Sequence, residues 1–309
     1  MVVTLTINPA IDRNIEADRL VFEDRAHILS QSDSAGGRGI IASSVLSSFG
    51  AKTLAIVTSG GKSGALLEKL LGKAGFPIEV VRIQQEIRTN FTIIDKHGLT
   101  IKLNEAGPPI TDSELEQIER AVASRLQKAT WLMLCGSIPP GVAPDFYCKL
   151  IRLAKGQNVK TLLDTDGEAL ANSIEEGPTI VKPNQQEAER LLNRALITRA
   201  HFIEAASRIK AMGPEAVILS LGSRGAIATD GNRMIEALPP RIDAGSPIGA
   251  GDAMAAAYVW AVNKKKEFAD AVRWAVAEAT ATAKLPGMNS ASLEQAKEVY
   301  KLVEIRENR

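Results

Sequence analysis

Residues 131–163 read WLMLCGSIPPGVAPDFYCKLIRLAKGQNVKTLL. The stretch opens with the apolar run Trp131–Cys135, continues with the amphipathic pattern Pro144–Lys155 and ends with a second apolar run, Val159–Leu163. A short apolar strand, an amphipathic helix and another apolar strand form a βαβ unit, whose two strands are parallel and lie in one sheet covered by helices. We therefore predict an α/β fold with a mostly parallel central sheet flanked by helices.

The same alternation recurs on both sides of this stretch, which predicts one domain over residues 1–309. Further strand-like runs lie at Thr4–Ile7, Thr53–Thr58, Thr179–Val181 and Ala216–Leu221. Helical patterns lie at Ser63–Ala74, Thr111–Lys128, Gln185–Asn193, Ala200–Met212, Ala250–Val262, Phe268–Lys284 and Ser292–Val303.

Two segments interrupt this alternation. Residues from about 13 to 32 and from about 80 to 103 read as strand after strand, and the second segment contains a turn at Lys96–Gly98. Neither segment carries a helical pattern. We therefore expect the two segments to form a small antiparallel sheet that projects from the main body.

The composition excludes several classes of protein. Lys and Arg total 37 and Asp and Glu total 36, so the net charge of +1 gives no field that attracts nucleic acid or an anionic membrane. No apolar run reaches the roughly 18 residues that a membrane-spanning helix needs. Two cysteines and three scattered histidines favour neither a disulfide framework nor a zinc site. We expect a cytoplasmic protein that acts on a small molecule, with no nucleic-acid or membrane partner.

Two segments imitate nucleotide-binding motifs without completing them. Ile56–Ser63 reads IVTSGGKS, but Ile56 stands where a P-loop needs its first glycine. We interpret it as an ordinary turn between strand and helix, with Lys62 exposed. Gly37–Ala42 reads GRGIIA, a formal G-x-G-x-x-A, but it does not follow the first strand and Ala51–Gly61 contains no acidic residue. Neither segment predicts a nucleotide site by itself.

The segment Ser246–Asp252, SPIGAGD, is more informative because it opens the predicted helix Ala250–Val262. The backbone N–H groups at a helix N-terminus have no partner within the helix, and the helix dipole is positive there. Such an N-terminus can therefore bind an anion. Gly249 and Gly251 allow a ligand to approach the backbone closely. Asp252 can be an ordinary helix cap, or it can accept a proton from a hydroxyl group while the N–H groups stabilise a phosphoryl group.

Six short motifs resemble the PfkB (ribokinase-like) family of carbohydrate kinases, and within it the phosphofructokinase and tagatose-6-phosphate kinase branch. They are Asn8–Asp12 (NPAID), Gly36–Gly39 (GGRG), Gly136–Gly141 (GSIPPG), Lys182–Glu187 (KPNQQE), Ser220–Gly225 (SLGSRG) and Gly249–Asp252 (GAGD). The resemblance implies a ribokinase-like fold in which the small sheet is a lid over the sugar. It also implies a homodimer joined through the two lids.

The resemblance implies that ATP is the phosphoryl donor and that Mg²⁺ is the cofactor. Asp252 matches the general base of the family, and Gly249, Ala250 and Gly251 match its anion hole. Glu187 matches a carboxylate that orients metal-bound water. The residues that match the nucleotide side of the site are Lys182, Asn184, Ser220, Gly222 and Gly225. Without the resemblance, an exposed charge pair at a helix start is the favoured interpretation of Lys182 and Glu187.

The acceptor side is implied in the same way. Asp12 matches the carboxylate that binds sugar hydroxyl groups, and Ser137 adds a hydroxyl group. An acceptor that already carries a phosphate also needs cations, because arginine binds phosphate through two parallel hydrogen bonds. The candidates for the acceptor pocket are Asp12, Arg25, Gly37, Arg38, Arg88 and Ser137. The alternative is that the two lid arginines, Arg25 and Arg88, are solvated surface charges.

One position departs from the family pattern. Ile41 stands where the family usually carries an asparagine that binds sugar hydroxyl groups, so one polar contact is lost or supplied elsewhere. We expect an ATP-dependent kinase of a ketohexose phosphate, such as fructose 1-phosphate, fructose 6-phosphate or tagatose 6-phosphate. The alternatives are a kinase of a free sugar or nucleoside, and a non-catalytic sugar- or nucleotide-binding protein of the same fold. The sequence leaves the sugar, the preferred nucleotide and any allosteric control open.

Overall fold

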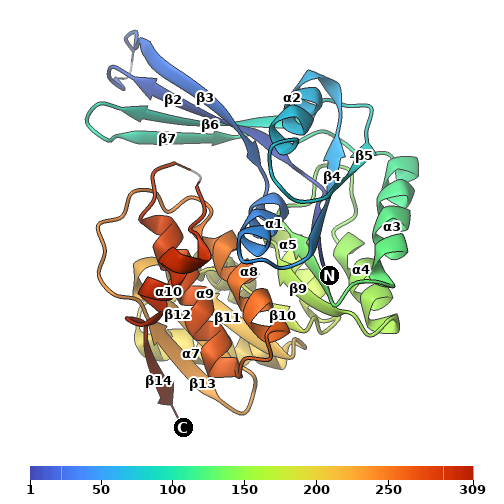
Figure 1. Cartoon of the computed structure of the whole chain (residues 1–309), viewed down its shortest axis with the longest axis vertical. Helices are drawn as coiled ribbons and strands as arrows, with labels where there is room; N and C mark the ends of the chain where they lie inside the picture. The colour runs from blue at the N-terminus through green and yellow to red at the C-terminus, as the bar shows by residue number, and fades with distance from the viewer. Residues whose placement is uncertain (22, 288, 309) are drawn as a thin grey trace.

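The computed structural model describes residues 1–21, 23–287 and 289–308. Its main body is built on one large sheet with helices on both faces (Figure 1). Among the described residues this sheet has ten strands, in the spatial order β14 (Glu304–Asn308), β13 (Met234–Leu238), β12 (Ala226–Thr229), β11 (Ala216–Ser220), β10 (Ile180–Val181), β9 (Lys160–Asp164), β8 (Trp131–Cys135), β1 (Val2–Thr6), β4 (Thr53–Ser59) and β5 (Ile78–Arg82).

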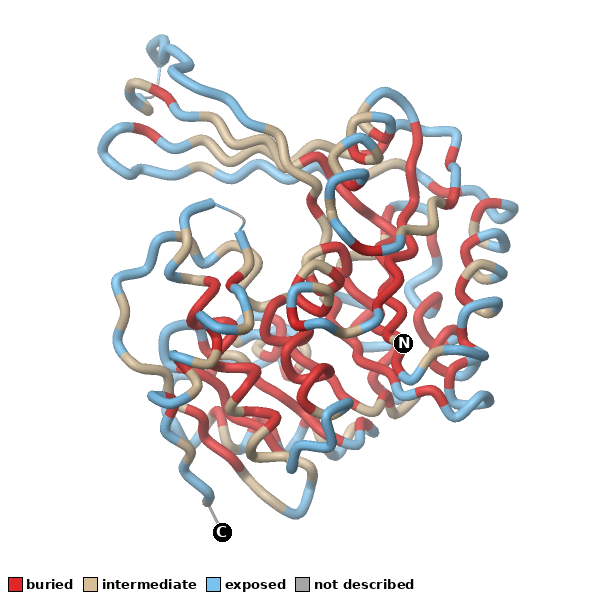
Figure 2. The backbone as a smooth tube through the Cα atoms, viewed as in Figure 1, coloured by how far each residue is buried: buried red, intermediate tan, exposed pale blue. Residues whose placement is uncertain are grey.

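The strands from β11 to β5 pair in parallel, and β12, β13 and β14 add an antiparallel end. Every residue of β1, β4 and β8 is buried, because helices cover both faces of the sheet there (Figure 2). The predicted α/β class is therefore confirmed.

Among the described residues, the helices and the sheet enclose three apolar cores. The first lies between the sheet and α1, α8, α9 and α10, the second lies between the sheet and α3 to α7, and the third lies between α2 and β4. The helices are α1 (Arg38–Ser48), α2 (Gly61–Leu71), α3 (Asp112–Leu126), α4 (Phe146–Gly156), α5 (Gly167–Ile174), α6 (Gln185–Leu192), α7 (Arg199–Ala211), α8 (Ala250–Asn263), α9 (Phe268–Ala283) and α10 (Leu293–Tyr300).

Five elements were not predicted: the helices α1 and α5, and the strands β12, β13 and β14. Helix α1 begins inside the G-x-G-x-x-A segment. Its buried residues include Gly39, Ile40, Ala42 and Ser43. Because the helix is largely buried, its sequence lacks the alternation of apolar and polar faces by which a helix is predicted. The P-loop-like segment is an ordinary connection, as interpreted, because β4 ends at Ser59, α2 begins at Gly61 and Lys62 is exposed.

A second sheet of four strands projects from the main body as a lid (Figure 1). Its spatial order is β3 (Ile28–Gly36), β2 (Ala10–Ala17), β6 (Arg88–Asp95) and β7 (Thr100–Asn104). Two expectations about it were wrong. The sheet is mixed, since β2 and β6 pair in parallel, and residues 80–82 belong to β5 of the main sheet. In β5, Val81 packs into the second core and Val80 packs against the third core, so β5 is stabilised in the main sheet and not in the lid.

Candidate active site

The start of α8 separates two cavities. Gly249 precedes the helix with φ 78°, a left-handed conformation that a side chain would strain. Gly249 and Asp252 line a cavity of about 290 Å³ beneath the lid, which we call the small cavity. Ala250 and Gly251 line a cavity of about 880 Å³ on the other side of the turn, which we call the large cavity. A group held at this turn is therefore within reach of molecules in both cavities.

The small cavity collects most of the residues predicted for the acceptor. Arg25 is the exception, because it is exposed in the connection between β2 and β3, at the far end of the lid from this cavity. The structure therefore does not bring Arg25 to the small cavity of its own chain. The predicted residues that line this cavity are Asp12, Gly37, Arg38, Arg88 and Ser137.

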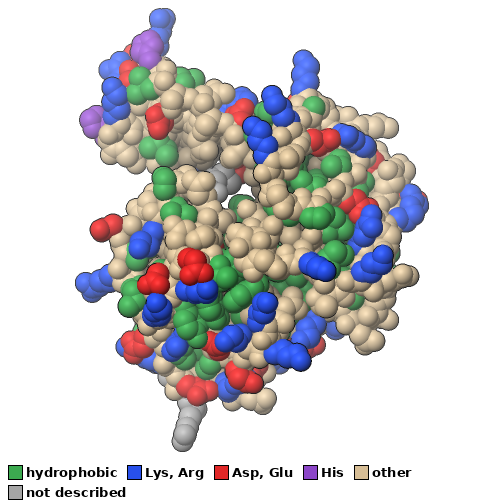
Figure 3. Space-filling view, viewed as in Figure 1, with side chains coloured by type: hydrophobic (Ala, Val, Ile, Leu, Met, Phe, Trp, Pro, Cys, Tyr) green, Lys and Arg blue, Asp and Glu red, His purple; other side chains and the backbone are tan. Residues whose placement is uncertain are grey.

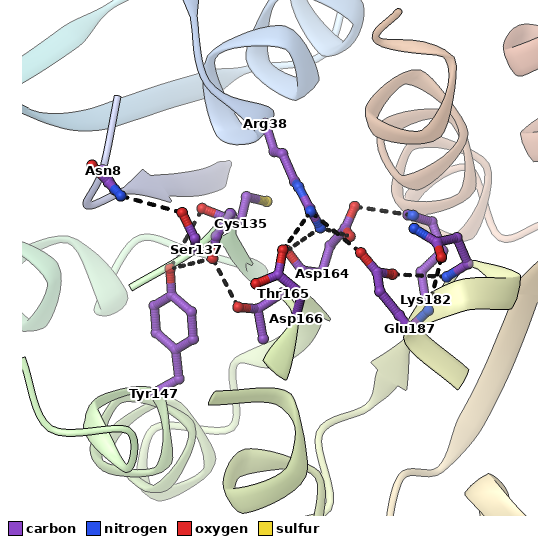
Figure 4. A network of polar contacts seen from close by, with 12 residues as sticks. Asn8, Arg38, Cys135, Ser137, Tyr147, Asp164, Thr165, Asp166, Lys182 and Glu187 are labelled. Atoms are coloured by element: carbon purple, nitrogen blue, oxygen red, sulfur yellow. Dashed lines mark hydrogen bonds and ion pairs between the residues drawn. The ribbon is translucent and has the colours of Figure 1, made fainter. Parts of the chain in front are cut away.

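Polar side chains of the small cavity hold one another in place. Asn90 donates a hydrogen bond to Asp12 (2.8 Å), and Asn8 donates one to the Ser137 hydroxyl group (3.2 Å; Figure 4). Both Nη atoms of Arg88 donate to backbone carbonyl oxygens at 3.0 Å. Burial raises the pKa of Asp12, which the hydrogen bond from Asn90 partly offsets.

Several buried polar atoms on this wall have no hydrogen-bond partner among the described residues. Buried polar groups are normally paired, so such atoms point to a ligand or to water that completes them. The atoms are Thr6 Oγ1, Asn8 Oδ1, Arg88 Nε and Asn90 Oδ1.

A cluster of charged side chains lies between the two cavities (Figure 4). Arg38 contacts Asp164 and Asp166, each at 2.9 Å, and Glu187 at 3.3 Å. Lys182 contacts the second carboxylate oxygen of Asp164 at 3.2 Å. Lys182 and Glu187 are only 4% and 5% exposed, so the alternative of an exposed charge pair is wrong.

Sequence reasoning missed Asp164 and Asp166. The available signal was their place, directly after the predicted strand Val159–Leu163. Ligands of parallel α/β sheets bind at the carboxyl ends of the strands, so acidic residues at that position are candidates for the site.

Asp252 faces this cluster from the first turn of α8. Burial raises the pKa of Asp252 to about 7, and the negative charge of Asp164 adds to the rise. The positive charges of Arg38 and Lys182 act in the opposite direction. A carboxylate whose pKa lies near neutrality suits proton transfer at physiological pH, because a large fraction of it is deprotonated there and it is still basic.

The large cavity receives most of the residues predicted for the nucleotide side. Asn184 also caps α6: its side chain accepts from the N–H of Glu187, whose carboxylate accepts from the N–H of Asn184 in return. Lys182 is buried and does not line the large cavity, but its Nζ is 3.6 Å from where a β-carbon on Gly251, which does line it, would stand. The predicted residues that line the large cavity are Asn184, Ser220, Gly222 and Gly225.

Residues 1–296 match the profile of the pfkB family carbohydrate kinases. The chain belongs to this family. It is 30% identical over 284 residues to a 1-phosphofructokinase of Borreliella burgdorferi, with 92% of each chain covered. It is 30% identical over 259 residues to a tagatose-6-phosphate kinase of Staphylococcus epidermidis, with 83% of each chain covered.

The fold of this pfkB-family chain also matches solved relatives. The phosphofructokinase-2 of Escherichia coli, crystallised in complex with potassium, superimposes with a TM-score of 0.91 at 28% identity and covers 97% of this chain and 98% of its own. The resemblance stated from the six motifs is thus confirmed at the level of family and ribokinase-like fold.

The surface agrees with a kinase of small molecules. Positive and negative side chains are interspersed over the face that Figure 3 shows, without an extended basic area there. Of the described helices, none has the length and apolar character needed to cross a membrane.

Proposed function

We propose that this pfkB-family chain transfers the γ-phosphoryl group of ATP to a hydroxyl group of a ketohexose phosphate. The reaction would be of the 1-phosphofructokinase, 6-phosphofructokinase or tagatose-6-phosphate kinase type. One observation carries the proposal: Gly249 and Asp252 line a polar cavity under the lid, while Ala250 and Gly251 line a larger cavity on the other side of the same helix start. The names of the relatives support the same substrate class. Because ATP is the donor, we place the reaction in the cytoplasm.

In the proposed mechanism, Asp252 accepts the proton of the acceptor hydroxyl group as that oxygen attacks the γ-phosphorus. The bond from the γ-phosphorus to the β,γ-bridging oxygen breaks, and ADP leaves. The N–H groups at the start of α8 stabilise the charge on the transferring group, because they point out of the helix toward it. Asp12 and Asn90 orient the sugar in the small cavity.

The charge cluster suits a site that also takes Mg²⁺. Four carboxylates (Asp164, Asp166, Glu187 and Asp252) face two cations (Arg38 and Lys182), so the formal charge is 2 − 4 = −2 before a triphosphate enters. Mg²⁺ neutralises phosphate charge in reactions of this type. Mg²⁺ keeps several waters and binds substrate phosphates, so it needs only one or two protein carboxylates. We propose that Asp166 and Glu187 would hold it, through water.

Arg88 is the cation that we assign to the acceptor's phosphate. It lines the small cavity, its Nη atoms contact only neutral carbonyl oxygens among the described residues, and its Nε is unpartnered there. A phosphate could therefore pair with it without displacing a carboxylate.

An acceptor screen tests the proposed function. Purified protein is incubated with ATP, Mg²⁺ and either fructose 1-phosphate, fructose 6-phosphate, tagatose 6-phosphate, fructose, ribose or adenosine, and ADP release is measured. We expect at least one ketohexose phosphate to give a kcat/KM well above that of every unphosphorylated compound. Preference for a free sugar or nucleoside would favour the alternative kinase, and turnover of none would favour a binding protein.

We further propose a homodimer joined through the lid. Strand alternation places Asp12, Asn90 and Asn104 on the lid face toward the small cavity. The opposite face carries apolar residues that lie beside one another in the strand register: Ile15, Phe91, Ile93, Ile101 and Leu103. Leu103 is 54% exposed. An apolar sheet face of this kind is suited to packing against a second copy of itself.

A further inference from the structure

Arg38 joins three separate elements at the boundary of the two cavities. It is the first residue of α1, and one Nη atom donates to Asp164 at the end of β9 (Figure 4). The other Nη atom donates to Asp166 in the following loop and to Glu187 in α6. A guanidinium group has a planar set of donors that can serve several carboxylates at once, which a lysine ammonium on a flexible chain cannot do with the same geometry.

These contacts occupy the atoms that a phosphate would need. Two-point binding of a phosphate uses a pair of guanidinium N–H groups. One Nη atom of Arg38 donates twice to Asp164 and the other donates to Asp166 and Glu187, so all four Nη N–H groups are engaged. Among the described residues, each Nη atom of Arg88 donates only once. Asp164 and Glu187 are also buried, with side chains 1% and 4% exposed, so neither can turn away into solvent to release Arg38. The carboxylates around the guanidinium group would in addition repel a phosphate.

The contacts of Arg38 continue toward the phosphoryl-transfer point. Asp164 accepts from Arg38 through one carboxylate oxygen and pairs with Lys182 through the other, at 3.2 Å. The Lys182 ammonium group in turn lies beside Gly251 in the first turn of α8. Arg38 thus holds the carboxylate of Asp164 in position. Asp164 in turn holds the buried ammonium group of Lys182 next to the anion hole at the start of α8.

We infer that Arg38 is a positioning residue for phosphoryl transfer and not a ligand of the acceptor's phosphate. It holds Asp164, Asp166 and Glu187 in one arrangement between the two cavities, and through Asp164 it fixes Lys182 next to the start of α8. This inference rests on the proposed function, and it revises the expectation that Arg38 binds the substrate.

Steady-state kinetics with the best ketohexose phosphate separate the two roles. We expect Arg38→Met to lower kcat by about 10²-fold, the scale at which small misplacements act, with a smaller change in the acceptor KM. Arg38→Lys should recover part of kcat, because it restores the charge but not the planar donors. Arg120→Met removes an exposed arginine of α3 and should keep wild-type values.

The inference is upheld if the loss in kcat exceeds the rise in acceptor KM. It is overturned if the rise in KM is the larger effect, or if both Arg38 variants keep wild-type kinetics. If Arg38→Met does not fold, as judged by circular dichroism, Arg38→Lys is used for the same comparison.

A second measurement does not depend on activity. If wild-type protein phosphorylates none of the sugar phosphates, the proposed function fails, but the contacts of Arg38 are still testable by thermal unfolding. Asp166→Asn should lower Tm less in the Arg38→Met background than in wild type, because its ion-pair partner is already gone. Equal losses of Tm in the two backgrounds would show that Arg38 does not act through this carboxylate and would overturn the inference.

Discussion

At the scale of single residues, the acidity of Asp252 leads to a prediction about pH. Burial raises the pKa of Asp252 to about 7, and a general base works only when it is deprotonated. The rate should therefore be constant above pH 8 and fall below pH 7, by about a factor of ten per pH unit. The measurement is kcat/KM between pH 6.5 and 9, because kcat/KM reports the groups of the free enzyme. Over this range the acceptor's own phosphate, which titrates near pH 6, is largely ionised. A flat kcat/KM between pH 6.5 and 8 would contradict this assignment.

Arg88 should discriminate between phosphorylated and free acceptors. Arg88→Ala removes a charge-assisted contact, which is worth roughly 1.5–3 kcal/mol, or a rise of about 10–100-fold in KM for a sugar phosphate. The KM for the free sugar should stay near that of wild type. Equal losses on both acceptors would mean that Arg88 only supports the lid.

Ile41 should control selectivity among epimers. It lines the small cavity and lies against Gly249, where a β-carbon would be 3.5 Å from its Cδ1. An apolar side chain cannot form hydrogen bonds with the hydroxyl groups that distinguish the epimers. We therefore expect the wild-type kcat/KM values for the fructose and tagatose phosphates to lie within about two orders of magnitude of each other. Ile41→Asn should sharpen the preference for one of them, because an unpaired buried amide penalises an acceptor that lacks the matching hydroxyl group.

The contrary outcome for Ile41 is equally measurable. If Asn104, which also lines the small cavity, replaces the lost contact, wild type would already be selective and Ile41→Asn would only crowd the pocket. Comparing kcat/KM for the two epimeric phosphates on both proteins decides between these cases.

At the scale of elements, the lid carries a prediction about assembly. Ile93 lies on the apolar lid face, whereas the next residue, Ile94, lies on the opposite face and is 40% exposed. Ile93→Asp should weaken dimerisation by about 10²–10⁴-fold in Kd, since burying an isoleucine is worth about 1.5–3 kcal/mol and a homodimer carries the substitution twice. Ile94→Asp is the matched control and should leave dimerisation unchanged.

Sedimentation or light scattering over a range of concentrations gives the mass of each lid variant. A wild-type protein that stays monomeric, or a control variant that dissociates as readily as Ile93→Asp, would contradict a lid-to-lid interface.

The same elements show where sequence reasoning ends. Alternation of strands and helices was sufficient to predict the parallel sheet, because each βαβ unit carries its own apolar signal. Helix α1 escaped detection because it packs against β1, β4 and α8 and has no polar stripe. The parallel pairing of β2 with β6 could not be predicted either, because it depends on β5 lying at the edge of the main sheet.

At the scale of the whole molecule, the site depends on contacts between distant segments. Residues near positions 12, 38, 88, 137 and 252 meet around one cavity, and only the order of the short motifs indicated this beforehand. Asp164 and Asp166 belong to no motif we recognised, and their role follows from the place of β9 between β8 and β10. Arg25 lies far from the cavity because the lid strands are long and Arg25 stands at their far end. The strand pattern in the sequence did not predict how long these strands are.

The most direct test of the account is the turnover of Asp252→Asn. This variant keeps the size of the side chain and removes its basicity, and the protein should fold as wild type. We predict that kcat falls by about 10²–10⁴-fold, the usual contribution of a positioned general base, while the affinities for ATP and the sugar phosphate change much less. A folded Asp252→Asn protein with near wild-type kcat would contradict the assignment of Asp252 as the base and, with it, the proposed mechanism.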